Sequence, residues 1–480
     1  MAKDTFGGMD PEEFRTIGKE VVDWIADYLK KPENYPVFPN IQPGDIKEQL
    51  PTVPPSSSEK MDVILQDFNK IIIPGITHWN HPGFHAYFSV TGSAPGILGE
   101  MLSAALNING MLWRTSPSAT ELEEVTLDWL RQMLGLPAEF RGVITDCGSA
   151  SNLIAIAAAR ESIHKRIREE GLAGRRDLPK LRLYCSDQTH SSVEKAAIVL
   201  GIGQEGVRKI PSDAEFKLNV KALAASIEED RNNGWFPFAV VATVGTTSST
   251  SIDPVPAIAD ICQKEKLWLH IDAAYGGMAG VIPEMRYLLD GCDRADSFVT
   301  NPHKWLFTPI DCSALYTRHV ATLKQAFSLI PEYLTTSDDS VNNYMDWGVQ
   351  LGRRFRALKL WFVIRSFGVN GIVGQLRKPC NLALEFASWI KADKDFELLA
   401  PVPLGVVCFR YHPHRISDET KLEHMNKKII DQINSTGEAF LSHTKLHGKY
   451  TIRLAIGNPA TTEQHLKRVW ELIKAETDKF

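Results

Sequence analysis

The chain has 480 residues, of which 44% are hydrophobic and 23% are charged, as in ordinary globular proteins. This length is sufficient for two or three domains with a substantial buried core. The net charge of −5 gives no electrostatic reason to expect nucleic acid or an anionic membrane as a partner. No apolar run approaches the roughly 20 residues that a membrane-spanning helix needs.

The seven cysteines are scattered through the sequence without CxxC spacing. Their odd number and their spacing favour reduced thiols over a disulfide framework or a zinc site. The first five residues have neither the apolar core of a secretory signal nor the Arg-rich composition of a transit peptide. We therefore expect a cytoplasmic protein.

The N-terminal part, residues 1–95, predicts a helix followed by an extended segment. Asp10, Pro11 and two glutamates are typical of a helix N-terminus, and an apolar stripe follows them along one helix face. Residues 32–58 then contain seven prolines and cannot form a compact unit. A helix on such an arm usually needs a partner surface, so we expect this segment to support a homodimer.

Residues 96–375 show an alternation of strands and helices that predicts a mainly parallel sheet covered on both faces. Helices are expected at 151–170 and 254–265 between strands at 142–145, 181–185, 238–244, 267–272, 296–300 and 312–316. Residues 376–480 predict a smaller α+β domain. Its expected elements are a strand at 404–411, a helix at 418–434, a hairpin around Gly448 and a last helix from Thr461.

Polar residues follow five of the expected strands, in the order Ser149, His190, Thr247, Asp272 and Lys304. Ligands bind at the carboxyl ends of strands in open parallel sheets. One site assembled from distant parts of the sequence is therefore expected there. Gly148, Ser149 and Ala150 begin a helix whose free N–H groups suit an anion, although an ordinary Gly/Ser helix start fits the same residues.

Asp272 and Lys304 are the most informative pair. Lys304 is flanked by Pro302 and Trp305, so partial desolvation should lower its pKa and free the amine to form an imine. Taken alone, it could equally be a surface lysine that packs on Trp305. No second carboxylate or histidine cluster supports a metal site at Asp272. Together the two residues match the aldehyde-binding lysine and the pyridinium-binding aspartate of pyridoxal phosphate sites.

Four motifs, at 186–194, 270–275, 301–305 and 351–361, resemble those of the aromatic L-amino acid decarboxylases, which are group II pyridoxal phosphate decarboxylases. The resemblance extends over nearly the whole chain. It implies the aspartate aminotransferase-like fold (fold type I), with a mainly parallel seven-stranded sheet in a large cofactor-binding domain at 96–375. It also implies a homodimer with active sites at the interface and no metal.

The resemblance implies a role for each site residue. Lys304 holds pyridoxal 5'-phosphate as a Schiff base, Asp272 pairs with the pyridine nitrogen, and His190 stacks on the ring. The remaining cofactor contacts are implied for Thr247 beside the ring, for His303 in positioning Lys304, and for Gly148, Ser149, Ala150 and Asn301 at the phosphate. Loss of CO₂ leaves a quinonoid intermediate that a tyrosine must protonate. Tyr344, in a polar lid expected at about 331–346, matches that tyrosine.

The substrate side chain is expected against six residues: Trp79, Tyr87, Phe88, Met111, Ile310 and Gly352. This apolar lining favours an aromatic amino acid, because burying an unpaired charge costs several kcal/mol. Gly352 resembles enzymes that accept indoles, which favours tryptophan and leaves tyrosine, dopa and phenylalanine open. The chain departs from the family's pattern at Ser89, Asn109, Met111 and Ile310, so substrate identity rests on fewer matches than the cofactor site.

Other functions fit the sequence less well than decarboxylation does. An oxygen-consuming aromatic aldehyde synthase uses the same scaffold, but its members tend to replace the lid tyrosine or the stacking histidine, and Tyr344 and His190 are present here. A third alternative is another pyridoxal phosphate protein, such as a glutamate decarboxylase relative or a scaffold that has lost activity, and intact Lys304, Asp272 and His190 oppose a loss of activity. Arg453 is either a carboxylate clamp or, as we expect, a structural arginine at the surface or at an interface.

Overall fold

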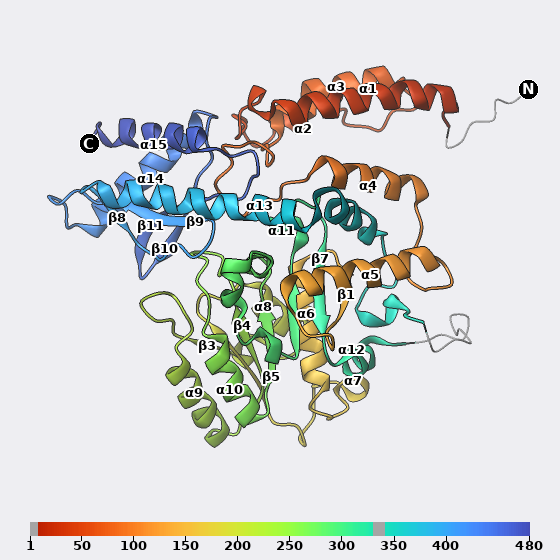
Figure 1. Cartoon of the computed structure of the whole chain (residues 1–480), viewed down its shortest axis with the longest axis vertical. Coiled ribbons are helices and arrows are strands. Elements are labelled where there is room, and N and C mark those ends of the chain that lie inside the picture. The colour runs from red at the N-terminus through yellow and green to blue at the C-terminus, as the bar shows by residue number, and fades with distance from the viewer. Residues whose placement is uncertain (1–7, 330–340) are drawn as a thin grey trace, which may run out of the picture.

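The computed structural model describes residues 8–329 and 341–480. A seven-stranded sheet lies at the centre of the larger unit, and a four-stranded sheet with its own helices forms a smaller unit beside it. The N-terminal helices lie along one edge of the molecule, over both the small unit and α4 (Ala94–Leu106) as seen in Figure 1.

The large sheet has the order β1-β7-β6-β5-β4-β2-β3. Neighbouring strands run parallel to each other, except that β7 runs antiparallel to both β1 and β6. The strands are β1 (Arg141–Thr145), β2 (Leu181–Ser186), β3 (Val207–Ile210), β4 (Phe236–Thr243), β5 (Trp268–Asp272), β6 (Ser297–Thr300) and β7 (Ser313–Thr317). The predicted mainly parallel seven-stranded sheet is confirmed. Strand β3 was missed because it is a short edge strand with one buried residue in four.

Helices cover both faces of this sheet. They are α5 (Pro117–Leu134), α6 (Gly148–Glu161), α7 (Ile167–Glu170), α8 (Ser192–Val199), α9 (Val220–Asn232), α10 (Val255–Glu265), α11 (Pro302–Trp305) and α12 (Val320–Phe327). The single helix expected at 151–170 is wrong in its extent. The backbone turns left-handed at His164 (φ 53°) and Arg166 (φ 51°), so α6 and α7 are separate.

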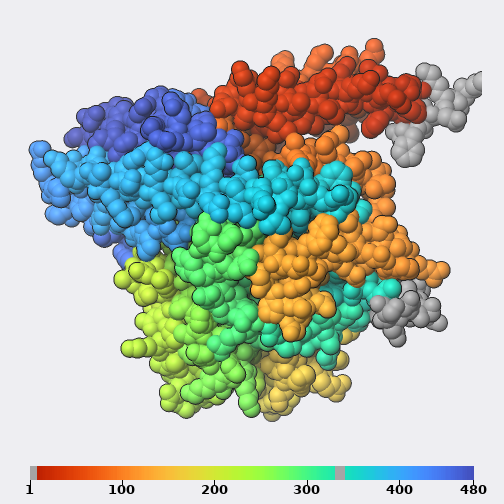
Figure 2. Space-filling model, viewed as in Figure 1, coloured from red at the N-terminus to blue at the C-terminus, as the bar shows by residue number. Residues whose placement is uncertain are grey.

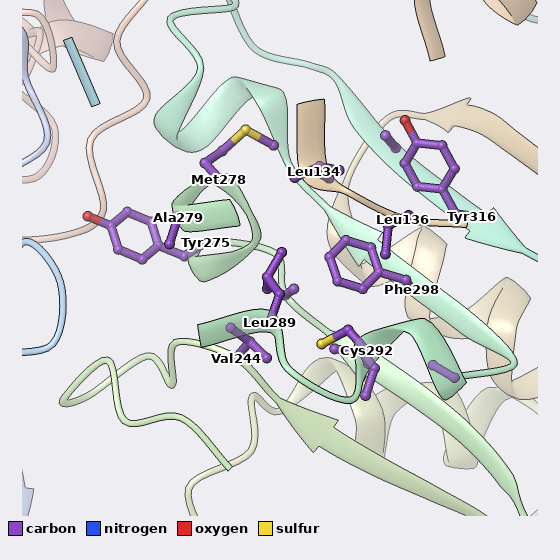
Figure 3. Close-up of a cluster of buried hydrophobic side chains, with 14 of the residues drawn as sticks. Leu134, Leu136, Val244, Tyr275, Met278, Ala279, Leu289, Cys292, Phe298 and Tyr316 are labelled. Atoms are coloured by element: carbon purple, nitrogen blue, oxygen red, sulfur yellow. The ribbon is translucent and has the colours of Figure 1, made fainter. Parts of the chain in front are cut away.

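Two hydrophobic clusters lie on the two faces of the sheet. Every residue of β2 and β5 is buried, which explains why these strands are almost continuously apolar in sequence. Figure 3 shows part of the first cluster, where Tyr275 and Met278 lie near the turns after β5, and Phe298 comes from β6. This packing fixes the strand ends from which the polar residues project.

The small unit contains the antiparallel sheet β10-β11-β9-β8 and two helices. Its elements are β8 (Phe396–Leu398), β9 (Val406–Tyr411), β10 (Ser442–Leu446), β11 (Lys449–Ala455), α14 (Glu419–Ser435) and α15 (Glu463–Thr477). Helix α13 (Arg356–Ala392) joins the two units and kinks at Gly368, where φ is 61°. The domain boundary expected at 375 therefore falls inside a helix shared by both units.

Helix α13 is also the one helix among the described residues with the length and hydropathy to cross a membrane. It packs against helices α4 and α5 of the large unit. A buried core helix meets the same criteria, so this observation is weak support for a membrane span.

The N-terminal arm consists of α1 (Pro11–Lys30), α2 (Asp45–Gln49) and α3 (Met61–Asp67). The carboxylate of Asp10 caps α1 by accepting from the N–H of Glu12 at 2.9 Å, as the sequence predicted. None of the residues of α1, all of which the structure describes, is buried. Figure 2 shows this arm as a ridge along one edge of the molecule, extending beyond α4.

Candidate active site

A cavity of about 210 Å³ lies at the carboxyl ends of the strands of the large sheet. It contains all five of the residues that the sequence placed after successive strands. The predicted residues that line it are Phe88, Gly148, Ser149, His190, Thr247, Asp272, Asn301, His303 and Lys304. The topology thus assembles them into one site.

Lys304 projects from α11, the short helix that follows β6. Its backbone N–H donates to the carbonyl of Asn301 at 2.9 Å, which fixes the turn between the strand and the lysine. Burial lowers the pKa of Lys304, the negative charge of Asp272 opposes that shift, and the positive charge of Arg453 adds to it. A lysine with a lowered pKa is more often a neutral amine and can attack a carbonyl carbon.

Asp272 ends β5, between Thr243 of β4 and Val299 of β6 in the sheet register. Its side chain is 4% exposed. One carboxylate oxygen accepts from the N–H of Ala274 at 3.1 Å, and the other accepts from Nδ2 of Asn152 at 2.9 Å. The two donors hold the carboxylate in one orientation, facing the cavity that Lys304 shares.

His190 lies at the mouth of the cavity. Its Nδ1 accepts from the backbone N–H of Ser192 at 3.2 Å and lies 2.8 Å from the Ser192 hydroxyl. Removal from water lowers the pKa of His190, and Asp272 partly opposes that shift. The ring is therefore neutral at neutral pH. Because Nδ1 accepts, the proton of the neutral ring is on Nε2.

The N-terminus of α6 opens onto the same cavity at Gly148 and Ser149. No side chain among the described residues caps this helix, so its first N–H groups are available to an anion. A Cβ at Gly148 would lie 2.9 Å from Nδ2 of Asn301, which explains the glycine. The amide oxygen of Asn301 accepts from the Ser313 hydroxyl at 2.7 Å. Ala150 lies one residue further along α6 and does not line the cavity.

Two further predicted residues are fixed by backbone contacts. Nδ1 of His303 accepts from the N–H of Cys312 at 2.9 Å, and burial lowers the pKa of His303 to about 4, so its ring is neutral and holds α11 in place. The carbonyl of Thr247 accepts from Nε of Arg453 at 3.1 Å. Arg453 also donates to the carbonyl of Ala86 at 2.9 Å, so it joins two backbone segments, and it is buried and not at the surface of this chain.

Of the six residues predicted to contact the substrate side chain, Phe88 alone lines the cavity. The ring of Phe88 lines the cavity and stacks on Tyr275 with 3.8 Å between ring centroids. The rings of Trp79 and Tyr87 stack on each other at 5.9 Å outside it. The remaining three, Met111, Ile310 and Gly352, do not line the cavity either, and Ile310 is 67% exposed.

Met111 and Gly352 nevertheless share a neighbour. Nδ2 of Asn109 donates to Sδ of Met111 at 3.4 Å, and a Cβ at Gly352 would lie 3.8 Å from the same nitrogen. The two residues therefore form a second group, which does not line the cavity of Lys304.

Tyr344, expected as the proton donor, does not line the cavity of Lys304 in its own chain. Tyr344 is 3% exposed and is the first residue of a short 3-10 helix (Tyr344–Trp347). Its ring lies against the guanidinium of Arg353 and the ring of Trp347. It borders a different cavity from that of Lys304. Burial raises the pKa of Tyr344 well above its usual value. A buried phenol with a raised pKa is a poor acid for a distant carbon. The rest of the expected lid, 331–340, lies outside the described residues.

Three side chains in or next to the cavity were not predicted from the sequence: Asn152, Ser192 and His270. Asn152 and Ser192 line the cavity, and His270 lies on β5 two residues before Asp272, so both side chains point to the same face of the sheet. That two-residue spacing was visible in the sequence. The contact with Asn152, 118 residues away, was not.

The site fits pyridoxal phosphate in three respects. A carboxylate held by two donors faces the cavity, an amine with a lowered pKa shares it, and an uncapped helix N-terminus borders it. These supply a partner for a ring nitrogen, a nucleophile for an aldehyde and a phosphate site. Within the described ranges, no three His, Cys, Asp or Glu side chains group as metal ligands do.

The profile described as the pyridoxal-dependent decarboxylase conserved domain matches residues 43–412. The chain belongs to this family. The decarboxylase is 42% identical to tyrosine decarboxylase 3 of Petroselinum crispum, over 98% of its own length and 93% of that protein. It is 41% identical to phenylacetaldehyde synthase of Arabidopsis thaliana, over 98% and 96% of the two chains.

Solved structures agree with this assignment. The crystal structure of Oryza sativa TDC with PLP and tryptamine superposes with a TM-score of 0.95, at 37% identity, and covers 99% of each chain. The protein is thus a pyridoxal phosphate-dependent aromatic amino acid decarboxylase. The fold type, the cofactor and the class of reaction expected from the sequence are confirmed.

Proposed function

We propose that this decarboxylase converts L-tryptophan to its arylalkylamine and CO₂. The observation that carries the proposal is the missing side chain at Gly352. A Cβ there would meet nothing nearer than Asn109 Nδ2 at 3.8 Å, so space is free beside Met111. A two-ring indole needs more room than a phenol. The relative whose structure contains tryptamine supports the same choice.

A competition assay between amino-acid substrates tests this proposal. The enzyme receives tryptophan, tyrosine, dopa and phenylalanine at equal concentrations, and mass spectrometry follows the amines over time. Tryptamine is expected to accumulate first. Faster formation of the amine from any of the other three would contradict the proposal, while leaving the decarboxylase assignment intact. Oxygen and peroxide are measured together with the amines, because aldehyde with peroxide would instead indicate the aldehyde synthase activity.

We propose the following roles for the chain's own residues. Bound through Lys304, the cofactor supplies an electron sink for the electron pair that the departing CO₂ leaves behind. Asp272 offers its fixed carboxylate to the ring nitrogen. The N-terminus of α6, with Ser149 and Asn301, holds the phosphate. The neutral His190 would cover one face of the ring and exclude water from it.

A proton must then reach the substrate Cα. The expected lid contains two tyrosines, Tyr333 and Tyr344. Since Tyr344 is buried beside Arg353, we assign the donor role to Tyr333, which lies outside the described residues. The assignment rests on this elimination and on the need for a general acid in the reaction.

We also propose that the enzyme works as a homodimer with its active sites at the interface. Helix α4 carries an exposed apolar stripe formed by Leu98, Met101, Leu102 and Leu106. Contiguous exposed apolar surface of this kind typically marks an interface. Met111, Ile310 and Gly352, which do not line the cavity of their own chain, would then complete the site of the partner. Analytical ultracentrifugation is expected to give twice the chain mass of 53.6 kDa.

The seven cysteines are all free, and six of them are buried, which supports a reducing, cytoplasmic location. A fluorescent fusion imaged in the source cell tests this location. Its fluorescence in a membrane-enclosed compartment would contradict it.

A further inference from the structure

One buried amide, that of Asn152, connects the two sides of the cofactor cavity. Asn152 is 1% exposed and lies on the second turn of α6. Its Nδ2 donates to Oδ2 of Asp272 at 2.9 Å and to the hydroxyl of Ser192 at 2.8 Å. Its Oδ1 lies 2.9 Å from Nε2 of His270. A primary amide has two N–H donors, so both are used here.

The direction of these hydrogen bonds is set by the Asp272 carboxylate, which can only accept and so takes an N–H of Asn152, and the far end fits the same direction. The indole N–H of Trp268 can only donate, and it donates to the Ser297 hydroxyl at 2.9 Å. The Ser297 hydroxyl is then free to donate to Nδ1 of His270, 2.8 Å away. Burial lowers the pKa of His270 to about 4, so the ring is neutral. Its one proton is on Nε2 and is donated to the Asn152 oxygen.

The amide of Asn152 therefore has one stable orientation. If the amide were rotated by half a turn, its oxygen would face the carboxylate of Asp272 at 2.9 Å, and two acceptors would be in contact. Its nitrogen would meet the N–H of His270 at the same distance. Unsatisfied buried polar groups of this kind are costly. His270 thus fixes Asn152, and Asn152 fixes Asp272.

The second branch runs to His190. The Ser192 hydroxyl accepts from Asn152, and its own hydrogen is directed to Nδ1 of His190 at 2.8 Å. The backbone N–H of Ser192 points to the same nitrogen. Both contacts leave the His190 proton on Nε2. The tautomer of His190 and the orientation of Asp272 are therefore set through the same amide.

We propose that Asn152 is a positioning residue that holds Asp272 and His190 in register in the cofactor cavity. The inference rests on the roles proposed above for these two residues. Without the amide, the Asp272 carboxylate keeps only the Ala274 donor and can rotate about its Cβ–Cγ bond. The Ser192 hydroxyl likewise loses the donor that orients it. Cofactor binding and the electronic environment of the ring should change together.

The experiment compares holoenzymes that carry Asn152→Ala, Asn152→Asp or the control Asn426→Ala. Asn426 is a buried asparagine of the small unit, and its amide bonds only to the backbone of Tyr411 and Leu422. Asn152→Asp has nearly the shape of the native side chain. It keeps an acceptor for His270 but replaces the two donors with a charged oxygen facing Asp272.

Two quantities are measured besides activity: the cofactor dissociation constant by equilibrium dialysis, and the pH midpoint at which the absorbance of the bound cofactor changes. Asn152→Ala is expected to weaken binding about tenfold or more, as for loss of a hydrogen bond to a charged group. Asn152→Asp should weaken it further, and both should move the pH midpoint. Asn426→Ala should lower thermal stability and leave both quantities within about twofold of wild type.

Two further variants keep the result interpretable. Asp272→Asn tests the proposed role of Asp272 directly. Ser192→Ala cuts the His190 branch and leaves the hydrogen bond from Asn152 to Asp272 in place, which keeps the test valid if Asn152→Ala fails to fold. Ser192→Ala is expected to lower kcat with little change in cofactor affinity. If Asp272→Asn weakens binding while a folded Asn152→Ala binds like wild type with an unchanged pH midpoint, the inference is overturned. If Asp272→Asn also binds the cofactor as tightly as wild type does, the proposed role of Asp272, on which this inference rests, is wrong.

Discussion

The guanidinium of Arg353 lies over the ring of Tyr344, with 4.6 Å between Cζ and the ring centroid. Arg353 is itself fixed, because its Nη2 contacts Glu123 at 2.6 Å and donates to the carbonyl of Ile144 at 2.9 Å. All three side chains are buried. The tyrosine is thus held against the end of β1 by a desolvated cation, an arrangement that stabilises packing and opposes movement.

The first prediction follows from that packing. Tyr344→Phe keeps the ring over which Arg353 lies and removes only the hydroxyl. We expect the variant to form amine at close to the wild-type rate and to lose less than about 1 kcal/mol of unfolding free energy. Product analysis and urea denaturation measure the two effects. Aldehyde and peroxide from this variant would restore Tyr344 as the proton donor.

Substrate choice should respond to position 352. Gly352→Ser places a hydroxymethyl group in the space beside Asn109 and should lower the ratio of kcat/KM for tryptophan to that for tyrosine about tenfold. Gly371→Ser is the matched control, because Gly371 is an exposed glycine of α13 with no expected role in the site. Steady-state kinetics with both substrates give the ratio. An unchanged ratio would remove the support for tryptophan.

Lys304 should be the one lysine that carries the cofactor. Reduction of the holoenzyme with borohydride, followed by digestion and mass spectrometry, is expected to place the adduct on the peptide containing Lys304. Lys359 is the internal control, since it is equally a lysine of the interior but contacts Glu100 at 2.8 Å. Lys304→Ala should abolish turnover. An adduct on any other lysine would contradict the assignment.

Acid should destabilise the fold through buried histidines. Burial lowers the pKa to about 4 at four of them, namely His81, His85, His270 and His303. In the unfolded chain a histidine takes up its proton near about pH 6.5, so between about pH 4 and 6.5 the unfolded state binds more protons. Their contribution to stability is therefore complete above that window and is lost as the pH falls through it.

The expected size is about 2 kcal/mol per buried histidine between about pH 7 and pH 5. Urea denaturation at saturating cofactor, repeated across this range, measures the loss. His85→Gln, which removes one of the four titrating groups, should make the pH dependence shallower. An unfolding free energy that stays constant from about pH 7 to pH 5 would show that these rings do not titrate as their burial requires.

The sequence was sufficient for much of the fold and the cofactor site, for a physical reason. Strands β2, β4 and β5 are buried on both faces, so their apolar runs are long and unmistakable, and their carboxyl ends carry the polar residues. Asp272 and Lys304 could be placed together because the topology of parallel strands brings such ends to one edge.

Contacts between residues that are far apart in the sequence could not be predicted in this way. The hydrogen bonds of Asn152 join α6 to β5 and to α8, and nothing in the local sequence distinguishes that asparagine from a helix-start residue. The burial of Tyr344 was not predicted, for a related reason. A polar segment with a tyrosine resembles a lid in sequence, whereas its burial depends on Arg353 and Glu123 from elsewhere in the chain.

The last prediction concerns Tyr333. After CO₂ leaves, the electron-rich Cα either takes up a proton, which gives the amine, or reacts with dissolved oxygen, which gives aldehyde, ammonia and peroxide. General acids of this kind contribute about 10²–10⁴ in rate, enough to reverse that partition. Tyr333→Phe should therefore continue to release CO₂ while its product shifts from amine to aldehyde, with oxygen uptake. Tyr344→Phe is the matched control and should not shift.

The same variant tests whether the tyrosine serves the partner's site. Lys304→Ala and Tyr333→Phe protomers are mixed, dissociated and allowed to reassort. If each site combines Lys304 of one subunit with Tyr333 of the other, half of the dimers are mixed and each has one intact site, so about a quarter of all sites should form amine. Amine is measured against the two parent variants. A verified mixed dimer that forms no amine would place both residues in the site of a single chain, and a Tyr333→Phe enzyme that forms only amine would exclude Tyr333 as the acid.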